Sequence, residues 1–156
     1  MNVIALFVAA LIPMIVGFVY YHKSVAGSAW MSVTGMTDEK AKEGNMALIF
    51  GVIYVFSVLL AFALSGLVNH QSGLVSLFGG DTTDELFKQV MAAKGTAFRT
   101  FKHGALHGFI ASIAIALPIL GTNALFEQKG WKYIWINLGY WAITLTLMGG
   151  LLCAWI

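Results

Sequence analysis

Two histidines four residues apart are the strongest candidates for chemistry in this sequence. His103 and His107 lie in the stretch Lys-His-Gly-Ala-Leu-His-Gly, residues 102–108. If the stretch is helical, both imidazoles share one face and are close enough to ligate one metal ion, to hold a haem iron or to pass a proton. Histidines at a membrane interface that bond to backbone, to lipid headgroups or to each other would give the same pattern, so both interpretations stay open.

A complete metal site would need more ligands than this pair. The further donors that the sequence offers are His22, His70 and Glu127, or a residue of another subunit. The metalloprotease pattern H-E-x-x-H is absent, because a glycine follows His103. We therefore take His103, His107 and His22 as a candidate metal or proton site, and we assign no catalytic residue.

A second polar group is predicted at the turn between the last two apolar segments. Asn123 and Glu127 are four residues apart, and Asn137 follows the short link 127–132. Because the link is short, we expect the three side chains to be neighbours. Such groups hold helices together by hydrogen bonds in many membrane bundles, and they could instead orient the headgroup of a ligand.

The composition of the chain indicates the solvent in which these residues must be positioned. Of 156 residues, 59% are hydrophobic and only 10% are charged, and the mean hydropathy is +0.82. Soluble domains carry about a quarter charged residues. The nine Lys and Arg residues form no basic stripe, so the sequence excludes nucleic acid as a partner. The expected partner is the lipid bilayer.

Four apolar segments are long enough to cross a bilayer as helices, since about 20 residues at 1.5 Å each span the hydrocarbon core. The segments are too long for barrel strands and lack strict alternation. The sequence therefore predicts an all-α integral membrane protein, a bundle of four transmembrane helices in a single domain, residues 1–156, with both termini on one side. The expected spans are residues 2–21, 46–68, 105–126 and 133–156.

The loops between the spans carry helical signals of their own. The mixed charges of residues 38–43 predict a solvated helical turn in the first loop. In the second loop, Thr82 and Glu85 fit a capping box that opens an amphipathic interfacial helix, which could run on into the third span. Pro13 and Pro118 lie within the first and third spans, where each removes a backbone hydrogen bond and kinks the helix.

Glycines punctuate the last two spans. Gly104 and Gly108 match the small-xxx-small pattern that lets two helices approach closely, and Gly121 and Gly139 continue the series. We expect all four to serve helix packing, within the chain or between copies of it.

The chain resembles the domain of unknown function 1761 family over nearly its whole length. The residues that carry the resemblance are 17–21, 29–31 and 35 near the N-terminus, and 121–127, 137–140 and 148–150 near the C-terminus. The resemblance implies a small bacterial multi-pass membrane protein, in the inner membrane, and implies no activity. Where the family often has Trp-Tyr-Ser, this chain has Tyr20, Tyr21 and His22, which leaves the role of His22 open.

Three functions of different classes fit the sequence. The first is a non-enzymatic module, a homo-oligomer or an accessory subunit of a partner membrane protein. The second is a small transporter or channel, although the expected spans contain no Asp, Glu, Lys or Arg, and ion pathways usually show such residues. The third is an enzyme or sensor that binds a metal or haem through His103 and His107.

Overall fold

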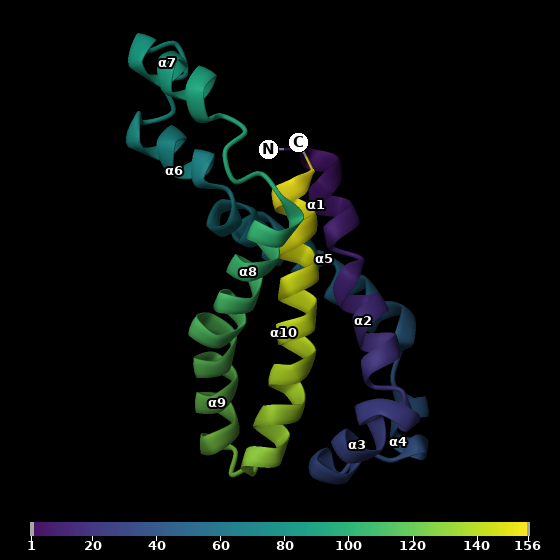
Figure 1. The fold of residues 1–156 in the computed structure, drawn as a ribbon. Coiled ribbons are helices and arrows are strands. Elements are labelled where there is room, and N and C mark those ends of the chain that lie inside the picture. Colours follow the sequence, from purple (N-terminus) through teal and green to yellow (C-terminus); the bar gives the residue numbers. More distant parts are fainter. Residues whose placement is uncertain (1, 156) are drawn as a thin grey trace.

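The computed structural model describes residues 2–155, and this part of the chain consists of helices and connecting turns without a strand (Figure 1). Four helical segments are long and apolar enough to span a membrane, which confirms the predicted all-α fold. They are Val3–Tyr20, Met46–Val68, Phe101–Phe126 and Trp131–Ala154. The third begins four residues before the predicted start at residue 105, so it includes Lys102 and His103.

Both prolines lie beside interruptions of regular helix. The first span is divided into α1 (Val3–Ala9) and α2 (Ile12–Tyr20), and Pro13 lies in the first turn of α2, where a missing N–H costs least. The third span consists of α8 (Phe101–Ala111), a π-helical turn η2 (Ser112–Ala116) and α9 (Leu117–Phe126).

The wide turn η2 ends two residues before Pro118, whose ring would clash with the carbonyl four residues earlier in a regular helix. The predicted disturbance at each proline is therefore present. In the third span it takes the form of an extra residue in one turn.

The last span, α10 (Trp131–Ala154), is the centre of the bundle. It packs against α8 and α9 on one side and against α1, α2 and α5 (Met46–Val68) on the other (Figure 1). Its side chains Ile134 and Met148 are fully buried. Large apolar side chains of the other spans, Phe18 and Phe56 among them, are exposed, as expected of residues that face lipid.

The first loop folds into short helices at the end of the bundle remote from the termini. They are η1 (Lys23–Gly27), α3 (Ser28–Thr34) and α4 (Asp38–Glu43). The helix α4 is the helical turn that the charge pattern predicts. Lys23 Nζ lies 2.6 Å from Asp38 Oδ2, and this hydrogen bond lowers the pKa of the Asp38 carboxyl, with a further contribution from the charge of Lys23.

The second loop folds into two helices, α6 (His70–Leu77) and α7 (Glu85–Lys94). The sequence patterns predict α7 but not α6. The predicted cap of α7 is wrong: the capping residue is Asp84, whose carboxylate accepts hydrogen bonds from the backbone N–H groups of Leu86 and Phe87, and Thr82 does not cap it.

The physical reason lies just upstream, where the Asp81 carboxylate accepts hydrogen bonds from the backbone N–H and the hydroxyl of Thr83. This local turn delays the start of the helix to Glu85. Nor does α7 continue into the third span. It ends at Lys94, Phe98 has a positive φ of 62° that a helix cannot contain, and Thr100 caps the new helix α8.

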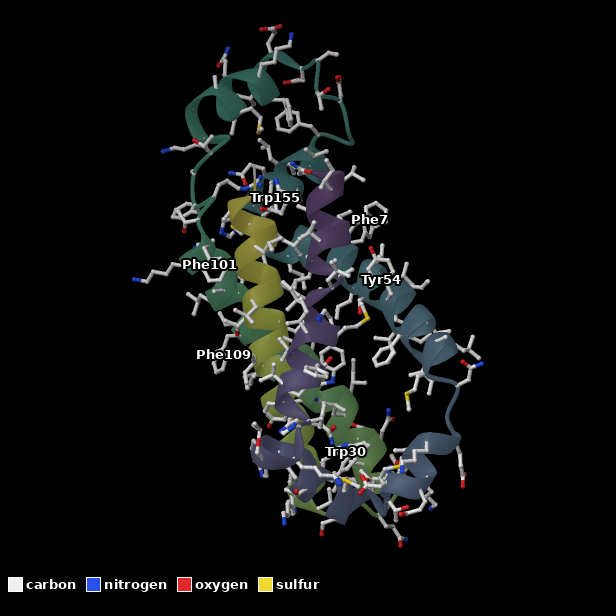
Figure 2. The ribbon with its side chains drawn as sticks, turned by 90° about the vertical axis from the view of Figure 1, so that its right-hand side faces the viewer. Phe7, Trp30, Tyr54, Phe101, Phe109 and Trp155 are labelled. Carbon is white, nitrogen blue, oxygen red and sulfur yellow. The ribbon has the colours of Figure 1, made fainter. Side chains whose placement is uncertain are left out.

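Both termini lie at one end of the bundle, as an even number of spans requires. The α6–α7 hairpin projects from that same end, whereas α3 and α4 lie at the other (Figure 1). Figure 2 labels Trp155 near the first end and Trp30 near the second.

Candidate metal centre

Three histidines meet where the second and third spans reach the end of the bundle that carries the termini. His70 is the first residue of α6, and His103 and His107 lie on one face of α8. Asn69 ends α5 with extended backbone, and its side-chain amide donates to the carbonyl of Ser65 at 2.9 Å. This break turns the chain at Asn69, so that His70 faces α8 rather than continuing along α5.

The three imidazoles face one another. One ligand nitrogen from each of them can be chosen so that the three atoms lie within 4.8 Å of one another. The Nε2 atoms of His70 and His103 are 2.8 Å apart. The ring centroids of His103 and His107 are 4.5 Å apart, and those of His70 and His107 are 5.2 Å apart.

This spacing fits a small metal ion. In a tetrahedral site with Zn–N distances of about 2.0–2.1 Å, the ligating nitrogens lie about 3.3 Å from one another. The observed separations, 2.8 Å for the closest pair and up to 4.8 Å in the group, lie on both sides of this value. The three nitrogens therefore have the spread expected of ligands to one ion, and the closest pair is also at hydrogen-bond distance.

The loop before α8 supports the cluster from one side. The ring of Phe98 lies 5.6 Å from that of His70 and 5.2 Å from that of His103. The Thr100 side chain accepts a hydrogen bond from the backbone N–H of His103 at 3.2 Å, which fixes the first turn of α8. The positive φ of Phe98 turns this loop, so the strained residue is also the one that packs on the imidazoles.

The end of α10 anchors the same loop. Arg99 Nε donates to the carbonyl of Cys153 at 2.7 Å, and Arg99 Nη2 donates to that of Trp155 at 3.1 Å. A cation at this position satisfies carbonyls that the helix leaves free and complements the negative end of its dipole. The buried Cys153 thiol donates to backbone carbonyls of Val68 and Phe98, so it serves packing and lies outside the histidine group.

The donor set indicates which ions would bind. The group contains three imidazoles and, within residues 2–155, no carboxylate belongs to it. Imidazole nitrogen suits Zn²⁺, Cu²⁺, Ni²⁺ and Co²⁺, whereas Ca²⁺ and Mg²⁺ need oxygen ligands. Three protein ligands leave a fourth position of a tetrahedral ion open. His70 is exposed and the other two are half-buried, so an ion can reach the site from water.

The other predicted donors lie elsewhere. His22 is exposed at the opposite end of the bundle, where it caps η1 and its Nδ1 lies 2.8 Å from the Ser24 hydroxyl. Glu127 forms an ion pair with Lys129 beyond the end of α9. The structure therefore brings His103 and His107 together with His70, which the sequence offered only as one of several further ligands.

The second predicted polar group is divided in the structure. Asn137 is 8% exposed and faces the first span: its Oδ1 accepts from the Tyr21 hydroxyl at 2.8 Å, and its amide donates to the carbonyl of Tyr133 at 2.8 Å. Asn123 and Glu127 are exposed. Among residues 2–155, no hydrogen bond links Asn137 to either of them. The contact with Tyr21 has no signal in the sequence, because the two residues are 116 positions apart.

The four glycines differ in their surroundings. A Cβ at Gly104 or at Gly108 would collide with backbone carbonyls of α10, so α8 and α10 touch through their main chains. A Cβ at Gly139 would collide with the Tyr20 hydroxyl. At Gly121 a Cβ would meet nothing within 4 Å, so this glycine makes no close contact within the described chain.

Comparison with curated proteins and with solved structures gives no match. A family profile does match: that of the proteins of unknown function DUF1761, over residues 4–153. The match covers all but the outermost residue of the first and last spans, and it includes all three histidines of the cluster; the chain therefore belongs to the DUF1761 family.

Proposed function

We propose that this protein is a membrane-embedded binding module for a transition-metal ion, with Zn²⁺ as the first candidate. The observation that carries the proposal is the convergence of three ligand nitrogens within 4.8 Å from two helices, with His70 33 residues from His103. Of the three functions that the sequence allows, this geometry supports the metal-binding one.

A bare ion suits the site better than a haem. The cavity beside His70, lined by Leu74, Met91 and Phe98 among others, has a volume of about 190 Å³. Sites for organic cofactors usually have volumes of about 300–1,000 Å³. His70 alone of the three histidines lines this cavity, and its volume is below that range, so it offers no pocket in which the cluster could hold a macrocycle.

An ion at this site would join the α6–α7 hairpin to the bundle. His70 belongs to α6, and the other two ligands belong to α8. Because the hairpin extends beyond the end of the spans (Figure 1), a bond from His70 to a shared ion would restrict its motion. An ion that binds only when His70 lies beside His103 and His107 stabilises that arrangement by mass action. The hairpin would therefore become more ordered as the metal concentration rises.

Cobalt titration tests this function, because tetrahedral Co²⁺ gives visible absorption bands and occupies zinc sites. The protein is purified in mild detergent through a tag without histidine. We expect one Co²⁺ per chain, displaced by Zn²⁺. His70→Ala, His103→Ala and His107→Ala should each weaken binding at least ten-fold, since even loss of an outer-sphere partner weakens many sites by about 10–100-fold.

His22→Ala is the matched control, since it removes an exposed imidazole at the other end of the bundle. It should bind metal as the unaltered protein does. Absence of stoichiometric Co²⁺ or Zn²⁺ binding by folded protein would contradict the proposal. Equal loss of binding in His22→Ala and His70→Ala would contradict it as well.

Two finer aspects of function are also part of this proposal. We propose that the protein resides in the bacterial inner membrane, as the family resemblance implies, and fractionation of a tagged chain tests this. We also propose that copies associate through α9, where Gly121 leaves room for a close approach. Native mass spectrometry in several mild detergents should then show oligomers that Gly121→Leu reduces, and a strictly monomeric unaltered protein would contradict this part.

A further inference from the structure

A second cavity lies toward the end of the bundle that carries α3, remote from the histidines. It has a volume of about 610 Å³ and is lined by residues of α2, α3, α5 and α10. Its size falls in the range of about 300–1,000 Å³ that small-molecule sites occupy. Nothing in the proposed metal-binding function uses this space.

Aromatic rings form much of its wall. Tyr21 packs against Trp30 with ring centroids 5.5 Å apart and against Tyr140 at 5.2 Å. The Tyr140 hydroxyl donates to the carbonyl of Pro13 at 3.0 Å, which ties α10 to α2 beside the proline. The rings are thus held in place before any ligand arrives, and they offer flat faces to a flat partner.

The polar groups of the cavity are neutral. Asn137 is 8% exposed and lines the cavity, and it donates one N–H to the carbonyl of Tyr133. An amide carries two N–H groups, and the hydrogen bonds of residues 2–155 give the second one no acceptor. The described lining includes no Asp, Glu, Lys, Arg or His. The cavity therefore offers a hydrogen-bond donor to an uncharged oxygen and no partner for a phosphate.

An apolar groove adjoins this cavity. It has a volume of about 350 Å³, lies among α5, α8, α9 and α10, and is lined by apolar side chains, among them Leu64, Ile115 and Leu145. Leu60 and Trp141 line both spaces. A ligand with a ring in the aromatic cavity could therefore continue as a hydrocarbon chain in the groove, inside the thickness of the membrane.

We propose that the two spaces form one binding site for a neutral lipid with a flat, carbonyl-bearing ring and an apolar tail, that is, a lipid of the quinone class. The ring lies against Tyr21, Trp30 and Tyr140, a ring carbonyl accepts the free N–H of Asn137, and the tail runs past Trp141 into the groove. A phospholipid would fill the groove equally well, but its charged headgroup finds no counter-charge in the cavity.

The test uses decylubiquinone, a quinone with a short tail, and full-length protein in mild detergent. Native mass spectrometry counts bound quinone, and a titration gives its affinity. Ser57→Leu fills the cavity. The Ser57 hydroxyl is bonded only to the carbonyl of Ile53 in its own helix, at 2.8 Å, so its loss leaves no other group unpaired. Gly51→Leu adds a larger side chain to the same helix in open space and serves as the control.

We expect one quinone per chain, with affinity at least ten-fold lower in Ser57→Leu and unchanged in Gly51→Leu. A second pair of variants probes the hydrogen bond: Asn137→Leu should weaken binding, and Asn123→Leu, the same change at an exposed position, should not. Circular dichroism establishes that each variant is folded.

Three results would overturn the proposal. They are a folded protein that takes up no quinone, quinone binding that Ser57→Leu and Asn137→Leu leave intact, and displacement of quinone by equal amounts of dioleoylglycerol or phosphatidylglycerol. None of them bears on Co²⁺ binding by the histidines, so failure here is distinguishable from failure of the metal site.

Discussion

Replacing Gly108 by alanine tests whether main-chain contact between α8 and α10 holds the bundle together. A Cβ at this position would collide with the carbonyl of Leu145 and lie 3.1 Å from Cα of Thr146. Both obstacles are backbone atoms, so no side chain can rotate away. The helices must separate locally, or the substituted residue must distort its own turn.

The expected cost combines two opposing effects. Alanine favours helix over glycine by about 0.8–1.0 kcal/mol. Forcing an extra methyl into a close-packed contact costs about 1–3 kcal/mol, occasionally more, through displaced side chains and backbone shifts. Because both obstacles here are backbone atoms, we expect the upper end of this range, and Gly108→Ala should destabilise the protein by about 2 kcal/mol net. Gly51→Ala in α5, where a Cβ meets nothing within 4 Å, should stabilise it by up to about 1 kcal/mol.

Reversible unfolding in mixed micelles, followed by circular dichroism, measures both free energies of unfolding. The metal site supplies a second readout, because a displaced α8 carries His107 away from His70 and should weaken Co²⁺ binding in Gly108→Ala alone. If the two alanine variants were equally stable, the close approach of α8 and α10 would not exist, and the packing argument would be refuted.

Further substitutions test the supports of the site and the surface helices. Arg99→Met removes two hydrogen bonds to the end of α10 and should cost about 1–3 kcal/mol in the same unfolding assay. Asp84→Ala should speed amide exchange in α7 by a factor that corresponds to about 1 kcal/mol, whereas Thr82→Ala should not. The lowered pKa of Asp38 means that its contact with Lys23 stabilises the loop above the ordinary pKa of Asp and is lost as the pH falls through the lowered value. NMR titration should show Lys23→Met moving the pKa of Asp38 back toward its ordinary value.

The membrane-spanning helices are the part of the fold that the sequence predicts well, because the bilayer sets their length and composition. Within the expected spans 46–68 and 133–156 the chain has no charged residue, and the structure forms the long helices α5 and α10 there. Length and hydropathy suffice for this, since every backbone group in lipid must be satisfied within its own helix. The third span is longer than predicted because Thr100 caps a helix that already includes Lys102 and His103, and polar residues in a first turn leave no hydropathy signal.

Only the two histidines of the candidate site that are close in sequence, His103 and His107, could be predicted to lie together. His103 and His107 share a face because four residues make about one helical turn, so their spacing alone brings them together. His70 joins them through a turn at Asn69, the two helices α6 and α7, and a loop that contains Phe98. Of these only α7 has a pattern in the sequence, so the sequence could name His70 as a donor and could not choose it over His22.

Two groups of polar residues in the membrane-spanning helices differ in how their hydrogen bonds are satisfied. Ser57 and Ser112 donate to carbonyls of their own helices, at Ile53 and Phe109. A hydroxyl bonded in this way is satisfied locally and requires no partner. Asn137 instead accepts a hydrogen bond from a different span, and its side chain lines a cavity.

The histidines of α8 likewise direct their rings toward another helix rather than toward their own backbone. Polar groups inside a membrane are costly, so those that are not satisfied within their own helix persist where they bind something. The histidines and Asn137 both meet this criterion, and they lie toward opposite ends of α10. Each has its own donor chemistry, imidazole nitrogen for an ion and amide N–H for a neutral oxygen, and this difference is why we assign the two ends to different ligands.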